Sequence, residues 1–451
     1  MSIVQDIQIT DKIGMGEYPR EAILGTAPRA MKASTKIVSV VPNTSSSIGQ
    51  NQTVQFNIPS RGMMRSHSAF LKFKFTPTTT GEFSFAGSAS SAGALINSVQ
   101  VQAGGTVLEN CLNYHLWHNN VVLAHASSAE GLAVEGITSG SYTTQQFTAN
   151  TQAEVSSTGA SLLAKASANF NVSSVKGTYY FTVPLFVGAF NNNNSQALPL
   201  FAINGGLLLT IQTNPISKAI FGTNFTDYSM SDFEFQYVEI QPDQSYINDI
   251  MGGLRAGKAI TIEADSYLNI QTAGSTSLRQ MFSLNMQSLN SCLWGTVRGA
   301  DAIGTSKYFV CSSGATETND IQGVRREVFL DNISIYNSSN QLNIDAVNYR
   351  LVQEALCGSI TDKATTPFIQ GQGVVNDAQT FNGSYRNQAY LLGLPTRNWI
   401  SDDVSFGGVP VSQLTVSFQD PRCAPSDTYY FYLVHSYLMV IDGNMQVSKL
   451  M

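Results

Sequence analysis

The chain has 451 residues, which is too long for one ordinary domain and predicts about two or three domains with sizeable cores. Hydrophobic residues make up 43%, which excludes intrinsic disorder, and charged residues make up 12%, about half of the roughly 25% of a typical soluble domain. The formal net charge of −6 argues against a strongly basic surface that wraps nucleic acid. The polar surface must therefore be largely Ser, Thr, Asn and Gln, which is typical of a surface that meets other protein or of a β-rich fold.

The five cysteines are scattered, and no two of them form a C-x-x-C pair. The sequence therefore predicts neither a disulfide framework nor a zinc site, and it is typical of assembly in a reducing compartment. Residues 1–12 alternate apolar and polar side chains, with acids at Asp6 and Asp11, and predict no signal peptide. No stretch approaches about 18 apolar residues, so we expect no membrane-spanning helix.

Residues 1–34 are predicted to form an N-terminal arm, because Pro19, Gly25 and Pro28 interrupt them and no long periodicity is present. Two interpretations of this arm remain open. It is a disordered or clipped terminus, or it becomes ordered against a neighbouring subunit or a membrane surface.

From residue 35 onward the hydrophobic period is two, which predicts strands. The predicted strands of the first half are Lys36–Val41, Thr53–Ile58, Ala69–Phe75, Asn97–Gln102, Thr106–Leu108, Thr178–Val183, Gly206–Gln212 and Phe233–Ile240. A helix is predicted over Asn110–His125, and the Ser-, Thr-, Ala- and Gly-rich residues 126–174 predict a long surface loop or tower. We expect a first β-domain over residues 35–245, followed by a glycine-containing linker over residues 246–258.

The second half repeats this organisation over residues 259–451. Its predicted strands are Ala259–Glu263, Arg279–Leu284, Asn332–Tyr336, Gln341–Ile344, Val411–Phe418 and Tyr429–Ile441. Asp345–Leu356 predicts a helix, and residues 357–388 predict loops. Because strands greatly outnumber helices, the sequence predicts an all-β sandwich or barrel in each half.

An internal repeat links the two halves. Val99 and Val101 align with Ile333 and Ile335, and Asn113-Tyr114-x-Leu116 aligns with Asn348-Tyr349-x-Leu351. Farther on, Leu209–Ile211 resembles Leu414–Val416, and each precedes an aromatic terminal strand, Phe233–Val238 or Tyr429–Val434. The shared order predicts two tandem copies of one β-domain, although any two β-sandwiches share part of such a pattern.

Several of these segments carry a resemblance to a known family. The hairpin followed by Asn113–Leu116 resembles the double jelly-roll major capsid proteins of tailless icosahedral double-stranded DNA viruses. So does the run Thr182–Leu185, Gln196–Leu200, Gly205–Ile211, which has a similar strand, Pro-Leu, Leu-Pro-Leu, strand order. The resemblance is best over residues 35–245 and extends to the second half through the repeat.

The resemblance implies two tandem eight-stranded jelly rolls with short helices and long loops. It also implies a non-enzymatic virion protein that is assembled inside the host cell and forms pseudo-hexameric homotrimeric capsomers. The implied partners are other copies of the chain, neighbouring capsomers and other capsid proteins such as penton or minor proteins. An internal lipid membrane is a candidate partner for the N-terminal arm, and no sequence-specific nucleic acid or cofactor is implied.

Motifs for catalysis or metal binding are weak. His115, His118 and His125 form an H-x-x-H-x6-H pattern that could ligate a metal, but no acid or cysteine at a fitting spacing completes a site, so packed or interface histidines are expected. Asp402 and Asp403 are adjacent and would point to opposite faces of a strand, which argues against an acid–base pair. We therefore predict no catalytic, cofactor-binding or metal-ligating residues.

Two minor features have ordinary interpretations. The Arg325–Arg326 pair favours a solvated or interface position, and the three tryptophans, Trp117, Trp294 and Trp399, favour core packing. The alternative to a capsid protein is a binding module of another class, a β-sandwich adhesin, lectin or tail-fibre domain. A hydrolase on a β-scaffold has no motif in its favour.

Overall fold

The computed structural model describes residues 33–44, 46–78, 81–85, 91–118, 171–172, 179–192, 196–222, 226–297, 325–338, 351, 354–355, 392–397, 407–419 and 425–451. The predicted arm lies outside the described residues except for its last two positions, and so does the predicted 126–174 loop except for residues 171–172. His125, Trp399, the Asp402–Asp403 pair, the predicted strand Gln341–Ile344 and most of the predicted helix Asp345–Leu356 also lie outside them.

The first half is built from strands whose side chains alternate between core and solvent. They form two four-stranded paths, β1-β13-β5-β10 and β3-β11-β7-β8. The bounds are β1 Ala33–Val40, β3 Thr53–Ile58, β5 Phe70–Pro77, β7 Ile96–Ala103, β8 Thr106–Leu112, β10 Tyr179–Pro184, β11 Leu207–Thr213 and β13 Tyr228–Pro242. In β5, for example, Leu71, Phe73 and Phe75 are fully buried and the lysines between them are half-buried, as expected for a strand with one covered face.

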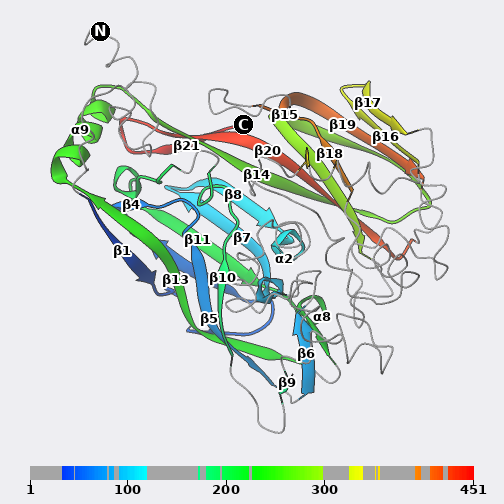
Figure 1. Cartoon of the computed structure of the whole chain (residues 1–451), viewed down its shortest axis with the longest axis horizontal. Helices are drawn as coiled ribbons and strands as arrows, with labels where there is room; N and C mark the ends of the chain where they lie inside the picture. Colours follow the sequence, from blue (N-terminus) through cyan, green and yellow to red (C-terminus); the bar gives the residue numbers. More distant parts are fainter. Residues whose placement is uncertain are drawn as a thin grey trace.

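These strands pair in a nested order. Strand β1 pairs with β13, β3 with β11, β5 with β10, and β7 with β8, all antiparallel. The chain is therefore one long hairpin that folds over into two facing sheets, which is a jelly roll (Figure 1). Short elements complete it: β2 Ser47–Ile48, β4 Met63–Met64, β6 Gly81–Phe85, β9 Asn171–Val172, β12 Ile220–Gly222, α2 Tyr114–Leu116, α8 Ile216–Ala219, and the 3₁₀ helices η2 Ala92–Leu95 and η5 Leu200–Ala202.

Helix α9, Gln244–Arg255, connects the two halves. The Asp243 side chain accepts a hydrogen bond from the Gln244 N–H at 2.8 Å and caps the start of this helix. The strands that follow are β14 Ile260–Ala273, β15 Ser277–Val297, β16 Arg325–Leu330, β17 Ile333–Ser338, β18 Leu392–Pro395, β19 Val409–Gln419, β20 Thr428–Ile441 and β21 Val447–Leu450.

Strand β15 explains why these strands join into a single eight-stranded sheet. Its first part pairs with β19, its last part pairs with β20 and β18, and register shifts at Ser283/Met286, Met286/Leu289 and Leu289/Ser291 lie at the change of partner. A strand that bends through such irregularities can pass from one sheet of a sandwich to the other. Counting its two parts as two strands gives the same paths as in the first half: β14-β20-β15-β18 and β15-β19-β16-β17. The second half is therefore a second jelly roll.

The topology corrects one part of the predicted repeat. The counterpart of β7, between its two neighbours in the sheet, is β16 and not β17, because β16 pairs with both β19 and β17. Val328 and Leu330 of β16 are buried like Val99, whereas Ile333 is 69% exposed. The alignment of Val99 and Val101 with Ile333 and Ile335 therefore joined non-equivalent strands. The pairs Leu209–Ile211 with Leu414–Val416, and Phe233–Val238 with Tyr429–Val434, do lie on equivalent strands, β11 with β19 and β13 with β20.

The predicted helix Asn110–His125 is wrong over its first part. Strand β8 continues to Leu112, because Asn110, Cys111 and Leu112 pair with β7. The strand ends at Asn113, which has the left-handed φ of 49°, and α2 follows. The local spacing of apolar residues does not reveal the pairing with β7 that holds these residues in an extended conformation.

Two hydrophobic clusters fill the molecule. The larger one fills the first jelly roll and continues onto one face of β14 and β20, and the smaller one fills the second jelly roll. The helices that the structure describes include none with the length and apolar character to cross a membrane.

Candidate functional site

The surface of contact between the two jelly rolls, here called the seam, is centred on β20. Nine consecutive residues of this strand, from Tyr429 to Tyr437, are buried. Tyr429, Phe431 and Leu433 pack into the second core, whereas Tyr430, Tyr432 and Val434 pack into the larger cluster with the first jelly roll. Both faces of the sheet are therefore covered, which explains the uninterrupted apolar and aromatic sequence of Tyr429–Val434.

Aromatic side chains hold one part of the seam. The Trp117 ring, just after α2, lies with its centroid 4.5 Å from that of Tyr267 on β14 and 5.4 Å from that of Tyr432 on β20. The Tyr267 hydroxyl donates to the Leu112 carbonyl at 3.1 Å. The Asn113 side chain donates to Asn269 Oδ1 at 2.7 Å. The end of β8 and the start of α2 are thus fixed to the second jelly roll by apolar contact and by hydrogen bonds together.

The fully buried carboxylate of Glu109 on β8 lies at the centre of the seam. It accepts hydrogen bonds from the Tyr437 hydroxyl at 2.6 Å, from the Ser266 hydroxyl, and from the Ala189 N–H at 3.1 Å. Two of these donors belong to the second jelly roll and one to the first. Burial raises the pKa of Glu109 above its usual value, and the charge of Lys449 and the three hydrogen bonds oppose that shift.

Lys449 on β21 supplies the positive charge that opposes the rise in the pKa of Glu109. Its Nζ donates to the Leu108 carbonyl at 2.7 Å and lies 4.2 Å from the centroid of the Tyr437 ring. The C-terminal strand is thereby attached to β8 of the first jelly roll.

A second buried acid, Asp265 on β14, organises the adjoining part of the second jelly roll. Its Oδ1 accepts hydrogen bonds from the Ser436 hydroxyl at 2.7 Å and from Asn290 Nδ2 at 2.9 Å, and its Oδ2 lies 3.7 Å from Arg397 Nη1. The backbone of Gly188, in the first jelly roll, approaches so closely that a Cβ there would lie 1.9 Å from the Asp265 carbonyl oxygen. Only glycine fits this point of contact.

The histidines and tryptophans considered from the sequence are buried wherever the structure describes them. His115 and His118 are buried, and burial lowers the pKa of His115 to about 3. The Nε2 atom of His118 lies 3.2 Å from the Pro184 carbonyl oxygen. Trp117 is in the seam, and Trp294 stacks on Phe431 in the second core. Within the described part of the chain, no three His, Cys, Asp or Glu side chains are grouped so as to hold a metal ion.

Sequence reasoning missed the polar centre of the seam, Glu109 and Asp265. Nothing in the local pattern distinguishes an acid on an inner face from one on an outer face. The only sequence signal was the absence of alternation in Tyr429–Tyr437, which predicts a strand covered on both faces but does not name what covers it. The arrangement binds the two domains together.

No protein-family model matches the sequence, and no curated protein matches it either. Solved structures do match. The PBCV-1 virus capsid has a TM-score of 0.55 at 12% identity, covering 94% of this chain and 98% of that chain. The Faustovirus major capsid protein has a TM-score of 0.56 at 9% identity, covering 92% of this chain and 91% of that one. The chain has a double jelly-roll fold.

A structure of the Sputnik virophage matches this double jelly roll with a TM-score of 0.53 at 12% identity, over 94% of this chain and 89% of that chain. At these identities the shared property is the fold. Both halves are part of that match, because the aligned region includes nearly the whole chain.

Proposed function

We propose that this protein is a major capsid protein, a structural subunit of the icosahedral shell of a tailless double-stranded DNA virus. The observation that carries the proposal is the double jelly roll itself, which matches viral capsid structures over more than nine-tenths of this chain. The role is structural and not enzymatic, and its place is the virion, after assembly inside the host cell.

The repeated fold suits this role for a geometric reason. One chain presents two similar bodies, so three chains around a threefold axis present six. Such a homotrimer is a pseudo-hexameric capsomer, which can tile a shell with one gene product. The seam supports the proposal because a buried, hydrogen-bonded contact fixes the angle between the two bodies that must tile together.

The partners follow from the same proposal. Each capsomer would contact neighbouring capsomers and other capsid proteins such as penton or minor proteins. The N-terminal arm, residues 1–34, would lie inward or sideways, where it could meet an internal lipid layer. The remaining units would be the first jelly roll over residues 35–245, the linker over 246–258 and the second jelly roll over 259–451. The net charge of −6 agrees with the expectation of no sequence-specific nucleic acid partner.

The proposal is tested by the mass and shape of the purified protein. Size-exclusion chromatography with light scattering should give about three times the chain mass of 48.7 kDa, and negative-stain images should show pseudo-hexagonal particles. A stable monomer would contradict the proposal. If that monomer bound specific sugars on a glycan array, the adhesin or lectin alternative would replace it.

The arm is tested separately. A chain lacking residues 1–30 should still form trimers but should fail to build complete shells. Normal shells from that truncated chain would refute a role for the arm in assembly.

A further inference from the structure

The seam uses one of two equivalent pairs of surfaces that the two jelly rolls carry. It joins the β8 end of the first jelly roll to the β14–β20 surface of the second. Because the two jelly rolls have the same strand paths, each also carries the other surface. The first jelly roll has the counterpart of β14–β20, which is β1–β13. The second has the counterpart of β8, which is β17.

The correspondence of Phe233–Val238 with Tyr429–Val434 in the internal repeat, together with their core-facing positions, specifies the first equivalence. On β13, Phe233, Phe235 and Tyr237 face the core of their own jelly roll, as Tyr429, Phe431 and Leu433 do on β20. On the outer faces of the two strands, Val238 of β13 then corresponds to Val434 of β20. Ile37 on β1 pairs with Val238, and Tyr267 on β14 pairs with Val434.

Ile37 and Tyr267 therefore occupy the same position in the two jelly rolls, but their surroundings differ completely. Tyr267 is 3% exposed because the first jelly roll covers it, whereas Ile37 is 74% exposed. Val41, directly after β1, is also largely exposed. A position that is covered in one jelly roll, while its equivalent in the other is apolar and exposed, is a candidate for contact with a second copy of the chain.

The second equivalence rests on β8 and β17. Each follows directly on a tight hairpin turn and forms the outer strand of its sheet path. Strand β8 is held in the seam through Leu108 and Glu109, whereas Ile333 and Ile335 of β17 are 69% and 41% exposed. Among the described strands, β17 pairs only with β16 and β1 only with β13, so each leaves an edge open to another chain.

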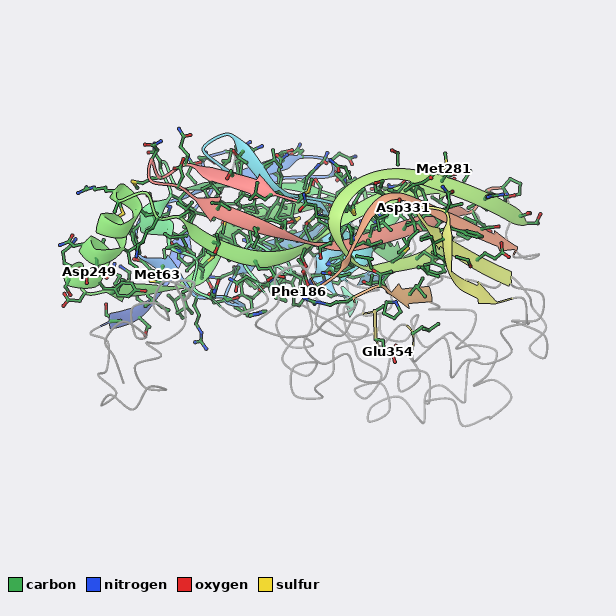
Figure 2. All side chains as sticks on the ribbon, turned by 90° about the horizontal axis from the view of Figure 1, so that it is seen from above. Met63, Phe186, Asp249, Met281, Asp331 and Glu354 are labelled. Atoms are coloured by element: carbon green, nitrogen blue, oxygen red, sulfur yellow. The ribbon has the colours of Figure 1, made fainter. Side chains whose placement is uncertain are left out.

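These two surfaces lie at opposite ends of the molecule. In Figure 1, β1 lies at one end of the long axis and β17 near the other. Figure 2 gives the same separation from a second direction, with Asp249 of α9 at one end and Asp331, which precedes β17, toward the other. Two unlike surfaces at opposite ends form a ring when the rotation between neighbouring copies closes.

We propose that the outer face of β1–β13 in one copy receives the β17 end of the second jelly roll of another copy, in a contact that repeats the arrangement of the seam. This inference rests on the proposed function and names the surfaces of its trimer. Ile37 and Val238 would take the places that Tyr267 and Val434 have in the seam, and Ile333 and Ile335 would face them.

The new contact is more polar than the seam, as suits subunits that associate after folding. Where β20 has Tyr430 and Tyr432, β13 has Glu234 and Gln236 at the matched positions. Glu234 is half-buried and forms an ion pair with Lys72 at 3.1 Å. Interfaces between separately folded chains have such polar margins around an apolar centre.

The test compares two aspartate variants with one matched control. Ile37→Asp and Ile333→Asp should each weaken self-association about a hundredfold or more, because each would bury an unpaired carboxylate in the contact. The control is Tyr180→Asp on β10, an equally exposed apolar residue at 64% on the opposite edge of the β1 sheet path, and it should leave the trimer intact. All three sites are exposed in the single chain, so the variants should fold, which circular dichroism and thermal melting verify.

A cysteine pair tests the contact directly. Ile37→Cys and Ile333→Cys in one chain should give disulfide-linked dimers and trimers on non-reducing gels, and either change alone should not. If the unchanged protein is a trimer but the aspartate variants associate normally and the cysteine pair stays unlinked, this inference is overturned and the proposed function survives. If the unchanged protein is a monomer, the proposed function fails as well.

Discussion

Strands β13 and β20 occupy the same place in the two jelly rolls, yet they differ in how they are buried. Along β13 buried residues alternate with half-exposed ones, whereas β20 is buried without interruption from Tyr429 to Tyr437. The cause is the number of covered faces: β13 has the core on one side only, and β20 lies between two cores. The position of a strand in the fold therefore determines the burial of the side chains on its inner face, and the neighbouring domain determines their burial on its outer face.

The acids near these strands differ in the same way. Glu234 on β13 accepts from the Ser39 hydroxyl and Lys72, and these hydrogen bonds, that of Ser39 first, lower its pKa. Glu109, enclosed between the two jelly rolls, has its pKa raised because burial outweighs its hydrogen bonds and Lys449. A carboxylate with solvent access is stabilised by its partners, and an enclosed one bears a desolvation cost that its partners only reduce.

The largest expected effect comes from placing the same substitution at two matched positions of β20 and β13. Val434→Asp should lower the free energy of unfolding by on the order of 4 kcal/mol or more, because it buries an unpaired carboxylate in the seam. Val238→Asp, on the half-exposed face of β13, should cost roughly 1 kcal/mol or less in the single chain. Urea denaturation of the dissociated chain measures both. Equal losses in the free energy of unfolding would contradict the difference in burial between the outer faces of β20 and β13.

The sequence predicted the strands because alternation is a local property. Thr53–Ile58 was predicted with the bounds of β3, and β5, β10 and β11 were each placed within two residues. The repeat predicted two copies of one β-domain, although its hairpin alignment joined non-equivalent strands, and the jelly-roll topology was implied by the family resemblance. The helix prediction for Asn110–His125 was wrong over Asn110–Leu112, because the pairing of β8 with β7 overrides a local apolar pattern.

The seam could not be derived in the same manner. Glu109 and Ser266 are 157 residues apart, and their contact depends on how the two domains dock. No local spacing encodes that docking. The apolar and aromatic run Tyr429–Val434 in β20 indicates a second buried face, but the identity of its partner becomes visible only in three dimensions.

The next test removes the close fit in the seam without adding charge. Gly188→Ala should cost about 1–3 kcal/mol, because the new methyl group collides with the Asp265 carbonyl oxygen and approaches Glu109. The control is Gly252→Ala in the exposed part of α9, where nothing lies within 4 Å of the new Cβ. That control should be neutral or slightly stabilising, since alanine is the better helix former. Thermal melting compares the two, and a neutral Gly188→Ala would mean that the two jelly rolls are less closely packed there.

A smaller effect separates a tyrosine hydroxyl that has a partner from one that lacks one. Tyr437→Phe should cost about 1–2 kcal/mol, because it removes a hydrogen bond to the buried Glu109 carboxylate. Tyr237→Phe on β13 should be neutral or stabilising, because the buried Tyr237 hydroxyl has no hydrogen-bond partner among the described residues. Chemical denaturation of both variants measures the difference. A larger loss for Tyr237→Phe would contradict the assignment of these partners.

The smallest effect concerns His435, a buried histidine of β20. Burial, with Lys449 next, lowers its pKa from 6.5 to about 4, and its Nδ1 lies 3.4 Å from the Leu433 carbonyl. A lowered pKa means that the unfolded chain binds a proton more readily than the folded one, so stability is full above pH 6.5 and falls as the pH drops toward 4. The loss from this residue should reach roughly 1.4 kcal/mol at about pH 5.5.

Glu109 acts in the opposite direction. Its raised pKa means that the folded chain keeps its proton more readily than the unfolded one, so its contribution is best in acid and falls as the pH rises through that raised value. His435→Gln should therefore flatten the acid side of the stability curve, and Glu109→Gln should flatten the fall toward higher pH. Denaturant titrations at a series of pH values measure both slopes. If the two substitutions changed the same side of the curve, burial at the seam would not be the cause of these shifts.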